Sequence, residues 1–186
     1  VQNRYDGLNN LIYTKKAEGE ETWFEYKTPG CNCGGSSELS AIIDGKGNRT
    51  NFKNDWMGRV LEIESPKGGR TVFKYDGRGN RTEVKVFSQD GQAKFTKSFK
   101  YDSMNNLSFE SDSVPFNGGL YANFYKNQGV GTVTVNTKYR YDGVGNMIEK
   151  SVQDGSSYGM KITYKYSPNN KLTQKQLKTF NDEDIV

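Results

Sequence analysis

Residues 73–82, FKYDGRGNRT, form the stretch that decides the fold. Their chemistry is that of a strand, a four-residue turn and the start of a returning strand. Asp76 suits the first position of a type I turn, and Gly79 can take the left-handed conformation that closes it. A left-handed residue at this point produces a bulged hairpin. Because the same solution recurs along the chain, the sequence predicts a repeat protein.

Turns of this type begin with Asp or Ser and have Gly or Asn as their fourth residue, the two residue types that best tolerate a positive φ. The predicted first and fourth residues are Asp6 and Asn9, Asp44 and Gly47, Asp55 and Gly58, Asp76 and Gly79, Asp102 and Asn105, Asp142 and Gly145, and Ser167 and Asn170. Two further turns are predicted to start at Ser65 and Asp90. Starts about 10 to 14 residues apart leave room for strands of about five to eight residues.

The segments before four of these turns share one layout, which is aromatic, basic, aromatic. They are residues 73–75, 99–101, 139–141 and 164–166. The period-two geometry of a strand places both aromatic side chains on one face and the cation on the other. No segment has a convincing helical period. We therefore predict an all-β, antiparallel meander of stacked β-hairpins in a curved or partly rolled sheet. Residues 1–180 would form a single array, with a frayed acidic tail at 181–186.

Composition limits the class of protein. The chain has 186 residues, a net charge of +4 and 24 aromatic residues, so the predicted core is thin and rich in Tyr and Phe. A basic balance this mild does not require a nucleic acid. No apolar run is long enough for a membrane span. The chain opens in mid-pattern at VQNRYDG, which we interpret as a mature form or an excised piece.

The segments YDGLNNL, YDGRGNR, YDSMNNL and YDGVGNM resemble the YD repeat of Rhs-type proteins, a group that includes polymorphic bacterial toxins, toxin-complex shell proteins and animal teneurins. Weaker copies occur at IDGKGNR, NDWMGRV and YSPNNKL, so the resemblance covers nearly the whole chain. It implies a long sheet of stacked hairpins, which in full-length relatives spirals into a hollow shell around a passenger polypeptide. Seven copies are too few to close a large shell. Neither the family's Asp-Pro core motif nor a toxin domain has a match here.

Two rows of side chains are candidate binding surfaces. The signature tyrosines are Tyr5, Tyr75, Tyr101, Tyr141 and Tyr166, and they would either stack sugar rings or pack the sheet. On the opposite face, a basic stripe of Arg4, Lys74, Lys100, Arg140 and Lys165 would meet an anionic glycan or an acidic partner. The alternative for the stripe is a solvated face interleaved with acids such as Glu62, Glu64 and Glu83.

Cysteine and catalytic chemistry are sparse. Cys31 and Cys33 would form a disulfide, remain two free thiols or supply half a zinc site, but the chain has no His to complete a site. The sequence also lacks the nucleophile-elbow and phosphate-loop motifs. We expect no metal, no cofactor and no enzyme activity. A polysaccharide-active enzyme with two convergent carboxylates remains the third hypothesis.

The leading hypothesis is a non-catalytic structural or interaction module of an exported bacterial surface or toxin-delivery protein. A carbohydrate-binding module using exposed aromatics and the basic stripe is the alternative. The expected partners are other YD repeats of a longer parent chain, an encapsulated or docked polypeptide, or a glycan, with an edge-paired homodimer for the isolated chain. The expected location is extracellular or at the cell surface, with the periplasm as a further option.

Overall fold

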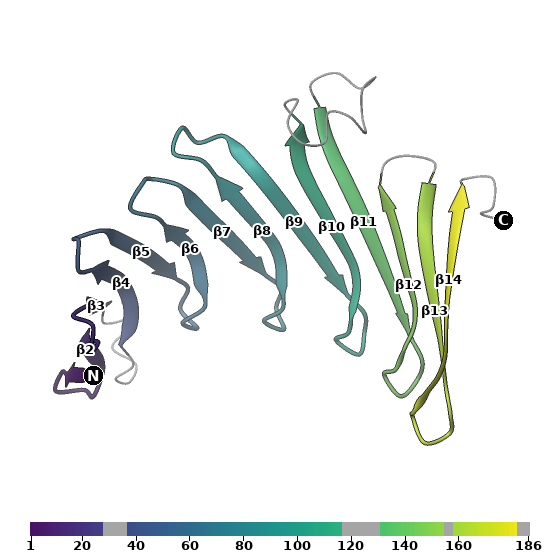
Figure 1. The fold of residues 1–186 in the computed structure, drawn as a ribbon, viewed down its shortest axis with the longest axis horizontal. Coiled ribbons are helices and arrows are strands. Elements are labelled where there is room, and N and C mark those ends of the chain that lie inside the picture. The colour runs from purple at the N-terminus through teal and green to yellow at the C-terminus, as the bar shows by residue number, and fades with distance from the viewer. Residues whose placement is uncertain (28–36, 117–130, 155–157, 182–186) are drawn as a thin grey trace. The chain divides into compact units, whose positions relative to one another are not determined.

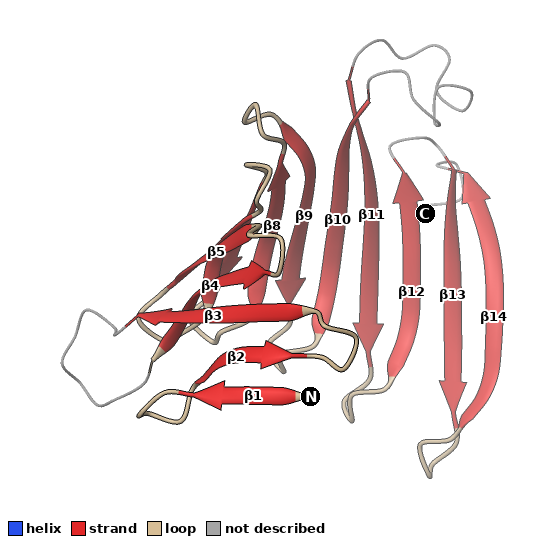
Figure 2. Cartoon of the chain, turned by 60° about the vertical axis from the view of Figure 1, so that its left-hand side comes forward, coloured by secondary structure: helices blue, strands red, loops and turns tan. Residues whose placement is uncertain are grey.

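The computed structural model describes residues 1–27, 37–116, 131–154 and 158–181 (Figure 1). This part of the chain contains strands and no helix (Figure 2). The strands are β1 (Gln2–Tyr5), β2 (Leu11–Lys15), β3 (Glu21–Lys27), β4 (Glu38–Asp44), β5 (Arg49–Asn54), β6 (Val60–Glu64), β7 (Arg70–Tyr75), β8 (Arg81–Phe87), β9 (Ala93–Tyr101), β10 (Leu107–Phe116), β11 (Gly131–Tyr141), β12 (Met147–Asp154), β13 (Tyr158–Tyr166) and β14 (Leu172–Asn181).

These strands pair in chain order from β1 to β14, so each hairpin is followed directly by the next. The predicted all-β antiparallel meander is confirmed. The chain divides into two compact units, one comprising Val1–Phe73 and Val86–Gln92 and the other Lys74–Lys85 and Ala93–Val186. Strands β7 and β8 contribute residues to both units. Cys31, Cys33 and residues 182–186 of the predicted tail lie outside the described residues.

One backbone turn is used throughout the described chain. In each of ten turns, the first residue donates its N–H to the carbonyl of the fifth, and the fourth donates to the carbonyl of the first, at 2.8–3.1 Å. The fourth residue has a positive φ every time, from 58° at Asn170 to 91° at Gly145. Register shifts next to the turns, for example between Arg140 and Tyr141, are the predicted bulges.

Two features of the predicted turns need correction. The turn predicted to start at Asp90 starts at Ser88 instead, because Gly91, with a φ of 79°, is its fourth residue. The turn at Asp44 matches the others locally, yet it joins β4 to β5, whereas the turns at Asp6, Asp55, Asp76, Asp102, Asp142 and Ser167 each join an odd strand to an even one. In a meander these two classes lie at opposite strand ends. We call the six odd-to-even turns the signature turns.

A tenth turn, starting at Lys16 and closing at Gly19, was not predicted. Its backbone hydrogen bonds are the same as those of the other turns, and Gly19 has a φ of 91°. Lys is not a residue that favours the first position of a turn, so the sequence signal is confined to the glycine. The left-handed fourth residue is therefore the more general requirement of this repeat, and the acid at the first position is an addition to it.

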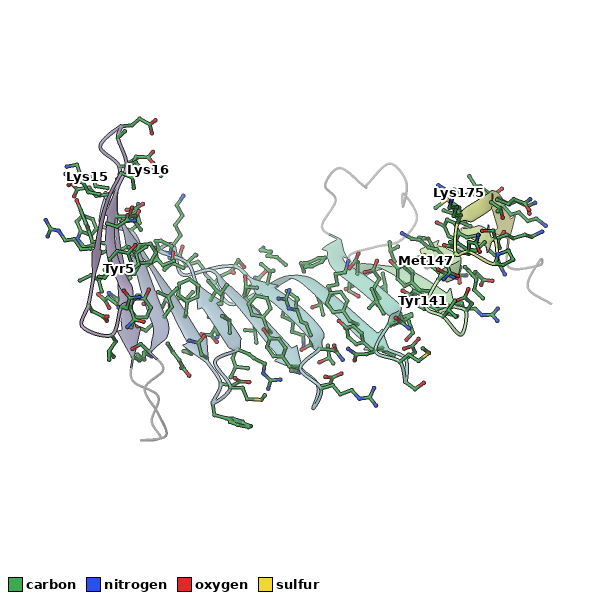
Figure 3. All side chains as sticks on the ribbon, turned by 90° about the horizontal axis from the view of Figure 1, so that it is seen from below. Tyr5, Lys15, Lys16, Tyr141, Met147 and Lys175 are labelled. Atoms are coloured by element: carbon green, nitrogen blue, oxygen red, sulfur yellow. The ribbon has the colours of Figure 1, made fainter. Side chains whose placement is uncertain are left out.

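Figure 3 shows side chains on both faces of the strands. Among the described residues, Ala41 is the buried hydrophobic residue, and Ser40 and Thr137 are the buried polar ones. Most aromatic side chains are half-buried. Because hydrophobic stabilisation is proportional to the apolar area removed from water, each of these residues contributes only part of its full value. The core is thin, so hydrogen bonds and ion pairs between strands contribute a larger share of the stability of the sheet.

Candidate functional site

The aspartate of each turn is used as a hydrogen-bond acceptor. In the turn at Asp142, Oδ1 accepts the backbone N–H groups of Val144 at 3.1 Å and Asn146 at 2.9 Å. Oδ2 accepts the side-chain amide of Asn146 at 2.9 Å. The same three bonds occur in the turns at Asp6, Asp44, Asp76 and Asp102. At Asp55, the guanidinium of Arg59 replaces the amide. These carboxylates are committed to local structure.

Acid is expected to destabilise the protein through these turns. A hydrogen bond from the asparagine side chain four residues on lowers the pKa of four of the aspartates below 3.8, namely Asp6, Asp44, Asp76 and Asp142. A group whose pKa is lower in the folded state stabilises that state above its unfolded pKa, and this contribution is lost as pH falls through the folded value. Denaturant unfolding from neutral pH to about pH 2 should therefore show stability falling below pH 3.8.

The control for this pH dependence is Asp142→Asn, which removes one titrating group and keeps an oxygen acceptor for the backbone N–H groups. The variant should be less stable than the wild type at neutral pH, because the amide nitrogen that replaces Oδ2 cannot accept the Asn146 side-chain amide. Its stability should fall less steeply in acid. A wild-type stability that stays constant into strong acid would contradict the assignment.

The signature tyrosines have a role that sequence reasoning missed. The Tyr141 hydroxyl, at the end of β11, donates to the backbone carbonyl of Leu107, at the start of β10, at 2.9 Å. Equivalent bonds at 2.9–3.0 Å run from Tyr101 to Arg81, from Tyr166 to Met147 and from Tyr26 to Leu11. In Figure 3, Tyr141 lies beside Met147 of the next strand. We call these hydroxyl-to-carbonyl bonds tyrosine braces.

The braces affect what the tyrosine row can bind. Tyr75, Tyr101, Tyr141 and Tyr166 are half-buried, and Tyr5 is 53% exposed, with its hydroxyl accepting the Asn3 side-chain amide at 3.4 Å. Burial raises the pKa of Tyr141. A ring that is half-covered and held by its hydroxyl offers only one partial face to a sugar. Phe at these positions would fill the same space but could not donate the hydrogen bond to the carbonyl. The repeated choice of Tyr before the turn acid was therefore the sequence signal for the tyrosine braces.

Replacing Tyr141 with Phe is expected to lower the free energy of unfolding by about 1 kcal/mol, the usual net contribution of one hydrogen bond, because the Leu107 carbonyl loses its donor. Tyr164→Phe is the matched control, since the Tyr164 hydroxyl has no hydrogen bond within the described part of the chain. Denaturant titration of both variants measures the difference. Equal losses would show that the Tyr141 hydroxyl is not a brace in solution.

The basic stripe is interleaved with acids and rings. Lys74 lies 2.9 Å from Glu83, and Arg140 lies 3.6 Å from Glu149. Arg4 lies over the Tyr13 ring at 5.0 Å, and Lys100 lies over the Phe109 ring at 5.4 Å. Lys165, exposed and opposite Gln174, is the member of the stripe for which the described residues show no ion pair or ring contact.

Three acids of this face, Glu62, Glu83 and Glu149, each lie near two cations. Glu62 lies 2.6 Å from Lys53 and 3.8 Å from Arg70. Glu83 also meets Lys85 at 3.2 Å, and Glu149 meets Lys161 at 2.9 Å. Each acid is no more than 20% exposed, whereas Lys74 and Arg140 are 64% and 69% exposed. The face therefore has mixed charge, with cations outermost, and its positive potential is weaker than the sequence alone indicates.

A charged cluster on the aromatic side of the sheet was also missed. Lys97 Nζ lies 3.2 Å from Glu110 Oε2 and 3.2 Å from Asp112 Oδ1, and it lies over the Phe99 ring at 5.6 Å. The Tyr139 hydroxyl donates to Glu110 Oε1 at 2.9 Å. Burial, followed by this bond to Glu110, raises the pKa of Tyr139. In strand β9, Lys97 lies on the same face as Phe99 and Tyr101, because alternate residues of a strand share a face. A charged residue at a position expected on the aromatic face was therefore the sequence signal for this cluster.

Metal and membrane chemistry are limited in the described residues. No group of three or more His, Cys, Asp or Glu side chains among them is arranged to hold a metal ion. No helix in the described ranges is long and apolar enough to cross a bilayer. Two carboxylates that the structure does bring together, Glu110 and Asp112, share one cation, Lys97, at 3.2 Å from each.

Comparison with known proteins identifies the fold. No protein-family model matches the sequence, and no curated protein matches it. Solved structures do: the chain superimposes on part of the Tc holotoxin pore of Photorhabdus luminescens with a TM-score of 0.72 and 16% identity, and on part of a TcdB2–TccC3 complex with a TM-score of 0.72 and 14% identity. Each match covers 95% of this chain and 9% of the other. At such identity the likeness establishes a shared fold.

Proposed function

We propose that the chain is a non-catalytic structural segment of a YD-repeat protein of the Rhs type, in an exported bacterial surface or toxin-delivery assembly. One observation carries the proposal: the residues that define the repeat are used to hold hairpins in place. The turn aspartates bind their own turns, and the tyrosines brace one strand to the strand before it. The fold shared with segments of Tc toxin complexes supports the same role.

The proposed partners follow from the sheet. The hydrogen-bonded order has β1 and β14 at its ends, so each has a neighbouring strand on one side only within the described chain. Residues 1–180 would act as one array. Further repeats of a longer parent chain would pair with its edge strands. The aromatic face would meet a docked or encapsulated polypeptide. An exported toxin-delivery protein would work outside the cell, at its surface or in the periplasm.

In the isolated chain, β14 is the longer of the two edges, with 10 residues against 4 in β1, and its Leu172 and Leu177 side chains are 54% and 58% exposed. We therefore expect self-pairing through β14. Sedimentation over a concentration series should show reversible association. Replacing both residues with Lys should abolish it, because charges on an edge strand oppose pairing. The matched control is Leu61→Lys, at an inner strand, where the side chain is 37% exposed.

The alternative, a carbohydrate-binding module, has weaker support, because four of the five stripe cations already lie against an acid or a ring. A glycan array covering neutral and acidic polysaccharides discriminates the two. The wild type should bind none of them. Salt-sensitive binding that is lost when Lys74, Lys100, Arg140 and Lys165 are all changed to Ala would overturn the scaffold proposal, particularly if the chain also stays monomeric at all concentrations.

A further inference from the structure

One signature turn departs from the pattern that the tyrosines set. The residue before the turn acid is Tyr at Asp6, Asp76, Asp102 and Asp142 and before Ser167, but it is Asn54 before Asp55. The Asn54 side-chain amide donates to the Leu39 carbonyl at 3.1 Å. This bond has the form of a tyrosine brace, because it runs from the end of an odd strand to the preceding even strand. It is made without an aromatic ring.

A hollow of about 460 Å³ lies at this position. Its lining includes Leu39 of β4, Phe52 and Asn54 of β5, Val60 of β6, and Trp56 and Met57 of the turn. All of these residues belong to the first unit. The volume falls within the range of small-molecule and side-chain pockets, and five of the lining side chains are apolar, namely Leu39, Phe52, Trp56, Met57 and Val60. Asn54 has a shorter side chain than the tyrosine at the same position in the other signature repeats.

The hollow is bordered by unusually exposed apolar side chains. Trp56 is 84% exposed and Met57 is 57% exposed. Met occupies the third turn position here as Met104 does in the second unit, where it is 59% exposed, but Trp at the second position occurs in this turn alone among the described signature turns. Trp and Met are enriched where proteins contact one another, and Met adapts its shape to a partner.

The charge at the rim restricts the partner. Glu38 lines the hollow, and it has no ion pair within the described residues, although Lys27 lies opposite it in register. The nearest turn cation, Arg59, is held by Asp55 at 2.6 Å. A partner that places an apolar side chain in the hollow therefore meets an available carboxylate beside it. Opposite charge next to the anchoring residue favours such a partner over a neutral or acidic one.

We propose that this hollow binds an aromatic side chain of a partner polypeptide, in a segment that has Lys or Arg next to the aromatic residue. The incoming ring lies between Leu39, Phe52 and Val60, against the exposed side chains of Trp56 and Met57. The inference deepens the interaction-module role and rests on it for biological meaning. The binding itself depends only on the described residues of the first unit.

The test uses the full chain and four defined probes: N-acetyl-Lys-Tyr-amide, N-acetyl-Glu-Tyr-amide, N-acetyl-Lys-Leu-amide and methyl glucoside. NMR shifts of the Leu39, Met57 and Val60 methyl groups and the Trp56 indole report binding. We expect saturable shifts with Lys-Tyr at a dissociation constant of about 1 mM, as suits a ligand of this size, and binding about tenfold weaker with the other three probes.

Asn54→Tyr is the decisive variant, because it supplies the ring that the other repeats have. It should weaken Lys-Tyr binding by about tenfold or more while keeping or raising the melting temperature. Met57→Ala should also weaken binding if Asn54→Tyr folds poorly. Met104→Ala, at the same turn position with nearly the same exposure, should leave binding unchanged.

Three results would overturn this inference: no saturable shift with any probe, equal binding by the wild type and Asn54→Tyr, or preferential binding of methyl glucoside. The first two results leave the expected behaviour of β14 and of the glycan array unchanged, so failure of the hollow and failure of the scaffold proposal can be told apart. Self-association through β14 with a silent hollow would leave the scaffold proposal standing.

Discussion

Gly145→Val is expected to lower the free energy of unfolding by about 2 kcal/mol, because Gly145 has a φ of 91°, which a β-branched residue adopts only under strain. A Cβ at this position would meet nothing within 4 Å, so the cost comes from the backbone and not from crowding. Denaturant unfolding monitored by circular dichroism measures it.

Gly143 provides the matched control, since it lies two residues earlier in the same turn, has no positive φ and also leaves a Cβ free of contacts. Gly143→Val should therefore change stability little. Gly145→Asn should cost less than Gly145→Val, because Asn already occupies the fourth turn position at Asn9, Asn105 and Asn170, with φ from 58° to 71°. Equal losses for the two valine variants would contradict the left-handed requirement.

Lys97→Met is the second change with a large expected effect, a loss of about 2 kcal/mol. Removing the ammonium leaves Glu110 and Asp112 next to each other without their cation, on a face where aromatic rings limit solvation. The cost is below that of a fully buried pair, because the Lys97 and Asp112 side chains are 26% and 36% exposed. Methionine keeps most of the packing volume, so the change tests charge.

Lys94→Met, an exposed position on the same strand, is the control and should be close to neutral. Adding Glu110→Gln to Lys97→Met should recover part of the loss, since one of the two unpaired carboxylates is then neutral. Tyrosine absorbance provides a second readout. The pKa of Tyr139 is raised by burial and then by Glu110, so its ionisation should begin at lower pH in the double variant. No recovery on adding Glu110→Gln would exclude carboxylate repulsion as the cause.

The candidate surfaces were predicted less well than the fold. The five cations of the basic stripe were placed on one face from strand parity alone, and cross-strand register then set their neighbours. Lys74 and Arg140 lie near Glu83 and Glu149, whereas Arg4 and Lys100 lie over Tyr13 and Phe109. Parity is local, but register is a property of two strands. For this reason the sequence left two alternatives, an open basic stripe and a face interleaved with acids, and the structure has a face of mixed charge.

Sequence by itself determined most turns and strands of this protein, because each turn needs a left-handed fourth residue and most add an acceptor at the start, both within five consecutive residues. The tertiary structure decided which of these elements act together. Tyr141 reaches a carbonyl 34 positions away, Lys97 reaches acids on the neighbouring strand, and the Asn54 hollow is lined by three strands. Such contacts depend on the pairing and spacing of strands. The type of a side chain determines which groups it can bind, and the fold determines which of those groups lie close enough to be bound.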